Sequence, residues 1–141
     1  MAIPYIYKSI SLLAALGMAL STGGCSPLGR NLVQEDTAKL EFRTASNSIV
    51  VGSANVYEKN DKLIVSGSVN RASGSRGRIR GHVDINVIDP DGKLLTRQTT
   101  ALLLPANSHS NGRSSRFLAY LDSVPPPGSV IQVAAHKGSH Q

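Results

Sequence analysis

The chain has 141 residues, of which 40% are hydrophobic and 17% charged, with four Tyr, two Phe and no Trp. This length accommodates one domain, and the composition is that of a folded chain whose core must be aliphatic, which excludes a large multidomain enzyme and a disordered polyampholyte. Basic residues outnumber acidic residues by 15 to 9, which gives a formal net charge of +6. One small basic domain is therefore predicted.

The first 24 residues have the pattern of an export signal. Lys8 is the only charged residue among them, and it precedes an uncharged, mostly apolar run from Ile10 to Leu20. A positive n-region followed by an apolar h-region is typical of a signal peptide. The run ends at small residues and is shorter than the roughly 20 apolar residues that a membrane-spanning helix needs. We therefore predict a signal peptide over residues 1–24.

Cys25, the only cysteine, follows Gly23 and Gly24 directly. This triplet resembles the lipobox of bacterial lipoprotein precursors, although Thr22 stands where that family usually has Leu. The resemblance covers the first 25 residues and implies that the Cys25 thiol is acylated, with palmitate-like chains, before cleavage makes it the new amino terminus. The alternative is an ordinary secretory signal cut near Ala19 to Ser21, which would leave Cys25 as a free thiol.

The same resemblance implies a location in the bacterial cell envelope, anchored by lipid and facing the periplasm. Ser26 follows the cysteine, and in Gram-negative members of the family the absence of Asp there favours the outer membrane. Without residues 1–24 the chain keeps a net charge of +5. The anionic surfaces outside the cytoplasm are lipid headgroups, lipopolysaccharide phosphates and acidic polymers, so nucleic acid is not expected as a partner.

Residues 26–38 are mostly polar and show no sustained period, so we expect residues 25–38 to form the lipidated cysteine and a flexible tether. Beyond Lys39 the chain alternates between apolar and polar residues, as strands with one buried face do. Residues 82–88 end at a turn over 89–92, and the chain resumes over 93–104, which predicts a β-hairpin. Further strands are expected at 40–44, 49–57, 63–71, 114–122 and 130–136, with a polar turn over 58–61.

About seven short strands without an amphipathic helix indicate an all-β fold. We predict a single antiparallel β-sandwich over residues 39–137, followed by a frayed tail over 138–141. In architecture the domain resembles small exported modules of immunoglobulin-like or transthyretin-like topology. It lacks the paired cysteines and the buried Trp of a true immunoglobulin domain.

Four arginines gather among Gly and Ser residues, at Arg71, Arg76, Arg78 and Arg80. Guanidinium groups pair bidentately with phosphates and carboxylates, so this segment is a candidate site for an anionic polymer or a membrane surface. The alternative is a solvated loop whose charge only keeps the domain soluble.

Histidines provide the alternative site, because imidazole is the commonest metal-binding side chain. Alternation places His82 and Asp84 on the same polar face of one strand, and His136 on the polar face of another. If those two strands are neighbours, the three side chains converge on a possible metal site. The chain contains no His-x-His or Cys/His cluster that requires this.

Motifs of catalysis are missing from the sequence, including the Gly-x-Ser-x-Gly elbow, His-Glu-x-x-His and a phosphate-binding glycine loop. Asp89 and Asp91 resemble paired carboxylates, but beside Pro90 and Gly92 they are turn residues. We therefore expect no enzyme and no cofactor. The expected function is binding, to an envelope protein or an anionic surface polymer, with a periplasmic metal-handling module as the alternative.

Overall fold

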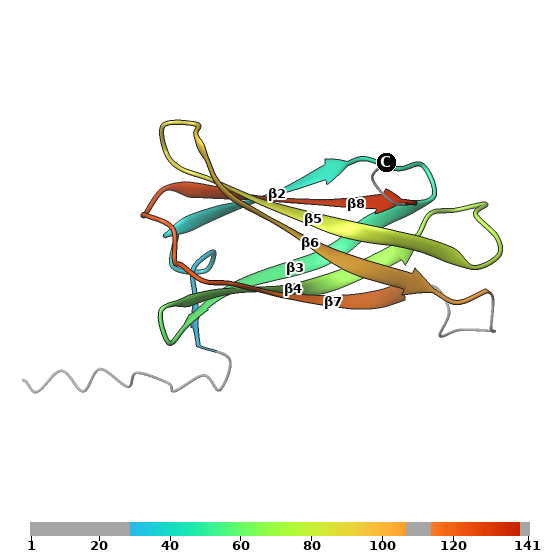
Figure 1. The fold of residues 1–141 in the computed structure, drawn as a ribbon, viewed down its shortest axis with the longest axis horizontal. Coiled ribbons are helices and arrows are strands. Elements are labelled where there is room, and N and C mark those ends of the chain that lie inside the picture. The colour runs from blue at the N-terminus through green and yellow to red at the C-terminus, as the bar shows by residue number, and fades with distance from the viewer. Residues whose placement is uncertain (1–28, 107–113, 139–141) are drawn as a thin grey trace, which may run out of the picture.

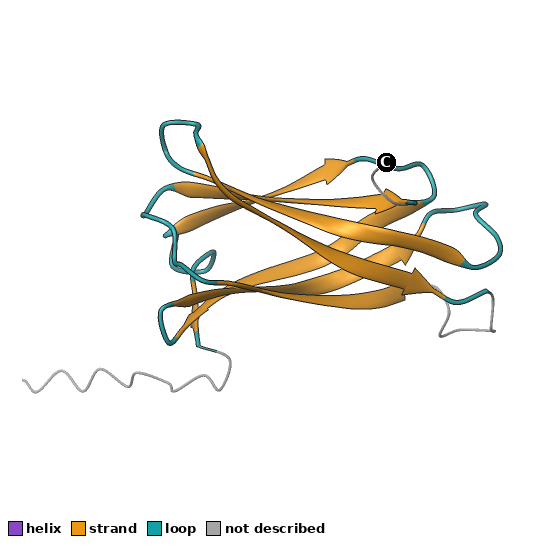
Figure 2. Cartoon of the chain, in the orientation of Figure 1, coloured by secondary structure: helices purple, strands orange, loops and turns teal. Residues whose placement is uncertain are grey.

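A computed structural model of the chain describes residues 29–106 and 114–138 (Figure 1). Throughout these ranges the chain forms strands and connecting loops (Figure 2). No helix long and apolar enough to cross a membrane occurs in them. The predicted signal peptide, Cys25, Ser26, His109 and His140 lie outside the described residues.

Eight strands form two sheets that face each other, so the predicted all-β sandwich is confirmed. The first sheet has the order β1-β3-β4-β7, with strands β1 (Arg30–Asn31), β3 (Ile49–Lys59), β4 (Lys62–Arg71) and β7 (Ser114–Leu121). The second has the order β2-β8-β5-β6, with strands β2 (Ala38–Thr44), β8 (Ser129–Lys137), β5 (Ile79–Ile88) and β6 (Leu94–Leu104).

The predicted hairpin around residues 89–92 and the predicted turn over 58–61 are both present. Asn60 and Asp61 join β3 to β4 with φ angles of 53° and 59°, the left-handed backbone that two-residue hairpin turns require. Between β5 and β6, the Asp89 carboxylate accepts backbone hydrogen bonds from Asp91 and Lys93 at 3.0 and 2.8 Å. Asp89 therefore acts as a turn residue, as its sequence context predicts.

The expectation of a purely antiparallel sandwich is wrong at one edge. β2 pairs in parallel with β8, from Ala38 opposite Ser129 to Thr44 opposite Ala135. A parallel neighbour requires a long connection, and here the five strands between β2 and β8 supply it. Alternation along a strand shows which residues share a face but does not show the direction of the neighbouring strand.

Part of the segment expected to be a tether belongs to the domain instead. β1 pairs with β3, and Leu32 is completely buried, with its N–H donating to the Val56 carbonyl at 3.0 Å. The domain therefore begins near Arg30 instead of Lys39, because one buried leucine holds a segment that has no periodic pattern. At the other end, β8 ends at Lys137, but the Gly138 N–H still donates to the Arg80 carbonyl at 2.9 Å, so Gly138 is held against β5. The rest of the predicted tail, 139–141, lies outside the described residues.

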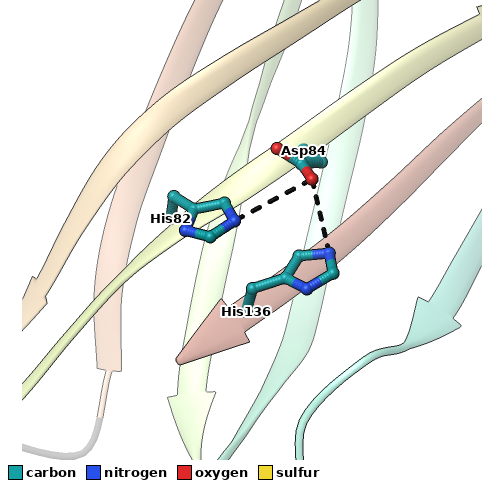
Figure 3. Close-up of side chains that lie close together, drawn as sticks. All are labelled: His82, Asp84 and His136. Carbon is teal, nitrogen blue, oxygen red and sulfur yellow. Dashed lines mark ion pairs between the residues drawn. The ribbon is translucent and has the colours of Figure 1, made fainter. Parts of the chain in front are cut away.

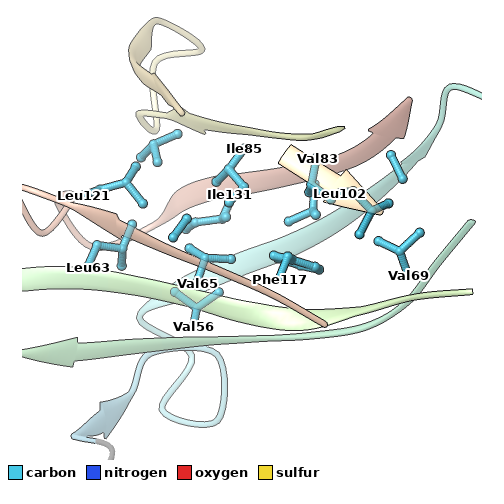
Figure 4. Close-up of a cluster of buried hydrophobic side chains, with 14 of the residues drawn as sticks. Val56, Leu63, Val65, Val69, Val83, Ile85, Leu102, Phe117, Leu121 and Ile131 are labelled. Carbon is cyan, nitrogen blue, oxygen red and sulfur yellow. The ribbon is translucent and has the colours of Figure 1, made fainter. Parts of the chain in front are cut away.

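The core lies between the two sheets (Figure 4). Among the described residues Phe117 is the only aromatic member of this core, and the rest are aliphatic, as the composition predicts. Gly67 on β4 lies directly opposite Phe117 on β7, and a Cβ atom at Gly67 would approach the phenyl ring to 2.7 Å. A glycine there lets the single large ring settle against the sheet.

Candidate functional site

The second sheet brings three predicted site residues together. β5 and β8 are antiparallel neighbours, and His82 lies directly opposite His136 in their register. Asp84 is two residues beyond His82 on β5, so its side chain leaves the same face of the sheet. Figure 3 shows the carboxylate of Asp84 beside both imidazole rings, with one oxygen facing a nitrogen of each ring. The two strands are therefore neighbours, as the convergence of His82, Asp84 and His136 requires.

One carboxylate oxygen faces both histidines. Oδ2 of Asp84 lies 3.4 Å from Nε2 of His136 and 3.9 Å from Nε2 of His82. Each of the three residues offers one ligating atom, and these atoms all lie within 4.8 Å of one another. The two rings are stacked, with centroids 4.9 Å apart and planes 5° from parallel.

The cluster is buried although it lies on the outer face of the sheet. His82 and Asp84 are 6% and 7% exposed, whereas the His136 side chain keeps 29% of its surface open to solvent. β5 is a central strand, and the neighbours of Asp84 and His82 include the small residues Ala134 on β8 and Ala101 on β6. The small neighbours leave room for the rings, and His136 forms the solvent side of the site.

Two outer contacts orient the cluster. The Nδ1 atom of His82 lies 2.8 Å from the Gly138 carbonyl oxygen, and the Thr99 hydroxyl donates to Oδ1 of Asp84 at 2.7 Å. A carbonyl oxygen can only accept, so Nδ1 of His82 carries the hydrogen and, in the neutral ring, Nε2 carries the lone pair. Such outer hydrogen bonds fix the tautomer and the orientation of metal-binding residues.

Together these contacts direct electron-rich atoms at one another. The Nε2 lone pair of His82 and Oδ2 of Asp84 repel each other unless a positive charge lies between them, and a metal ion or a proton can supply it. A tetrahedral zinc ion with bonds of about 2.0–2.1 Å requires ligand atoms about 3.3 Å apart. The two measured separations, 3.4 and 3.9 Å, are close to that value. Two imidazoles and one carboxylate leave a fourth position open, on the side of His136.

The fold gives one arginine of the predicted group a different environment from the other three. Arg71 turns inward at the end of the sandwich, where its Nη2 donates to the Pro105 carbonyl at 2.8 Å and its Nε and Nη1 atoms are buried. Arg76 and Arg78 are exposed in the loop before β5, and Arg80 is exposed on β5 itself. Arg71 thus links the two sheets, and only three of the four arginines present their charge to solvent.

Two residues of the site, Thr99 and Gly138, were not anticipated from the sequence. Thr99 lies opposite Asp84 in the β5–β6 hairpin, but a bulge between Val87 and Ile88 shifts the register by one residue, so counting outward from the turn would have placed Gln98 there instead. Gly138 contributes only its backbone carbonyl, which no side-chain pattern reveals.

A scan against protein-family models and comparisons with curated proteins and with solved structures found no match for this chain. The functional argument therefore depends on the geometry of the chain itself.

Proposed function

We propose that this chain is an exported, lipid-anchored envelope protein that binds a divalent transition-metal ion through His82, Asp84 and His136, without catalysing a reaction. The observation that carries the proposal is the convergence of one ligating atom from each residue within 4.8 Å, on two neighbouring strands. Export and the anchor at Cys25 are inferred from the amino-terminal sequence.

The ligand set favours zinc or copper over magnesium or calcium. Imidazole nitrogen is a ligand of Zn²⁺ and Cu²⁺, whereas the harder ions prefer oxygen atoms throughout. The separations between Oδ2 of Asp84 and the two Nε2 atoms, 3.4 and 3.9 Å, are close to those around a tetrahedral ion. Copper(II) generally binds such nitrogen and oxygen sites more tightly than zinc does, so both ions belong in the test.

The position of the site in the fold agrees with an anchored binding module. β1 pairs with the end of β3 at Glu58, whereas Ile49, at the start of β3, lies beside Gly81 near the site. Glu58 and Ile49 are separated by about 30 Å along the strand. A domain attached to a membrane through Cys25 would therefore hold the metal site at the end of β3 that is remote from β1, toward the periplasm.

The proposal is tested by competition between the purified protein and a chromogenic zinc chelator. The wild-type protein is expected to remove one equivalent of zinc from the chelator. His136→Gln and Asp84→Asn are expected to lose at least a hundredfold in affinity, because they remove a ligand and not merely one of the outer partners that contribute 10- to 100-fold. His109→Gln is the matched control, since it removes an imidazole but leaves the cluster intact.

Thermal unfolding gives an independent measurement. An ion that binds only the folded state at a hundred times its Kd adds about 2.7 kcal/mol of stability. Zinc should raise the Tm of the wild type and of His109→Gln, but not the Tm of Asp84→Asn. A wild-type protein that takes up no zinc or copper, or one whose uptake is unchanged by both cluster variants, contradicts the proposed function.

A further inference from the structure

A second candidate site lies on the outer face of the first sheet. A groove of about 470 Å³ runs past Tyr57, Ile64 and Tyr120, and an adjoining groove of about 700 Å³ runs past Ser53, Ser68 and Arg116. Ser66 and Leu118 line both, so the two grooves are continuous along β4. This face is opposite to the sheet that carries His82 and Asp84.

The strand register arranges the residues of the groove in four rows. Three rows cross β3, β4 and β7, and one crosses β3 and β4 only. The rows in order are Lys59 and Lys62; Tyr57, Ile64 and Tyr120; Asn55, Ser66 and Leu118; and Ser53, Ser68 and Arg116. Residues that share a face of a strand are about 6.7 Å apart, so four rows extend over about 20 Å. The groove is therefore long enough for several units of a linear polymer.

Small hydroxyl residues form the floor of the groove, and larger residues form its walls. Ser66 and Ser68 lie on the middle strand, and the hydroxyls of Ser53 and Ser68 are 2.9 Å apart. Tyr57 and Tyr120 stand on either side of Ile64, and Tyr120 is 59% exposed. A floor of hydroxyls disfavours a purely apolar partner, while exposed aromatic rings provide apolar faces for a flat ligand.

The charge of the groove is positive. Its lining includes Lys59, Lys62 and Arg116 and no acidic side chain. Lys62 has an acidic partner in Asp122, whose carboxylate lies 3.6 Å from it with a side chain that is 98% exposed, so solvent screens this pair strongly. An anionic ligand is therefore complementary to the groove.

We propose that this groove binds an acidic polysaccharide, one whose sugar rings carry carboxylates. The tyrosines receive the apolar faces of the rings, the serines and Asn55 bond to ring hydroxyls, and Arg116 pairs with a carboxylate. The inference needs neither the metal site nor the lipid anchor, because it depends only on residues of β3, β4 and β7.

Affinity electrophoresis and calorimetry of the purified full chain test the proposal, with polygalacturonate as the acidic probe and a neutral galactan and polyphosphate as comparisons. Polygalacturonate should bind, the galactan should bind at least tenfold more weakly, and polyphosphate should fail to displace the acidic polymer. Tyr120→Ala and Arg116→Gln should each weaken binding roughly tenfold, as expected for an aromatic contact and a charge-assisted hydrogen bond.

Arg78→Gln is the matched control, since it removes the same charge from an exposed loop outside the groove. Arg78→Gln should leave the affinity for polygalacturonate within twofold of the wild type. Asp84→Asn should do the same, which would show that polymer binding does not depend on the metal site. Equal losses for Arg78→Gln and Arg116→Gln would mean that net charge alone attracts the polymer and would overturn the proposal. Equal binding of the neutral galactan, displacement by polyphosphate, or unchanged affinity in both groove variants would overturn it too.

Discussion

His82 and His136 are cross-strand partners whose rings stack 4.9 Å apart and within 5° of parallel. The lone pair of an imidazole nitrogen lies in the plane of its ring, so two rings in separate parallel planes cannot both direct a lone pair at one ion. Metal binding at this site therefore requires one ring to turn. Nδ1 of His82 is held by the Gly138 carbonyl at 2.8 Å, whereas His136 is partly open to solvent. His136 is the ring expected to move.

Long-range ¹H–¹⁵N NMR of the histidine rings tests this asymmetry at neutral pH. His82 should carry its hydrogen on Nδ1 both without and with zinc, because a carbonyl oxygen accepts from that atom in either state. Zinc should change the ring-current shifts of His82 protons as the His136 ring turns out of the stack. A His82 ring that carries its hydrogen on Nε2 in the metal-free protein contradicts this assignment.

Thr99→Val should weaken zinc binding roughly 10- to 100-fold, the usual effect of removing an outer partner of a metal ligand. The Thr99 hydroxyl donates to Oδ1 of Asp84 at 2.7 Å and leaves Oδ2 to face the histidines. Valine keeps the shape of the side chain and removes that donor. Zinc affinity is measured by chelator competition.

Thr100→Val is the control for Thr99→Val, because Thr100 is the next residue on β6 and its side chain leaves the opposite face of the strand. It should keep wild-type zinc affinity. If the two valine variants behave alike, the hydroxyl of Thr99 does not orient Asp84.

Strand positions and faces could be predicted from the sequence because alternation is a local property. The two-residue alternation of apolar and polar side chains places His82 and Asp84 on one face of a strand, and His136 on the polar face of its own strand. That β5 and β8 are neighbours is set by how the two sheets pack, and no local pattern contains it. The sequence therefore predicts that Asp84 and His136 converge only if their two strands are neighbours.

Residues without a periodic pattern were missed for a related reason. Leu32 is a single apolar residue in a polar segment, and its burial depends on the pairing of β1 with β3. The groove is a second case, because Tyr57 and Tyr120 are 63 positions apart and meet only through their common neighbour Ile64. Single-sequence patterns do not encode such long-range pairings.

Gly67→Ala should destabilise the domain by about 1–3 kcal/mol, the usual cost of overpacking. The added Cβ would lie 2.7 Å from the Phe117 ring and would also collide with the Ser53 carbonyl oxygen, so both must shift. The free energy of unfolding is measured by urea denaturation. The variant Phe117→Leu lacks the ring. In that background Gly67→Ala should reduce the free energy of unfolding by less than it does in the wild type. An unchanged urea midpoint for Gly67→Ala would show that the core accommodates the methyl group.

The lipid anchor is tested by intact-mass analysis of the protein from bacterial membranes. The expected mass is that of the chain from Cys25 plus acyl groups, because acylation precedes cleavage in the family that the triplet Gly23 to Cys25 resembles. Cys25→Ala should lose both the added mass and the partitioning into membranes. Cys25→Ala should still bind zinc, since the metal site contains no cysteine.

A soluble wild-type product that begins near Thr22 with an unmodified thiol would instead show cleavage as an ordinary secretory protein. In that case Cys25 would lie five residue steps from Arg30, the first residue of β1. Five steps span at most about 18 Å, which is shorter than the roughly 30 Å between Glu58 and Ile49 along β3. An unmodified thiol would therefore not reach the histidines, and the proposed zinc site would be unaffected by the loss of the anchor.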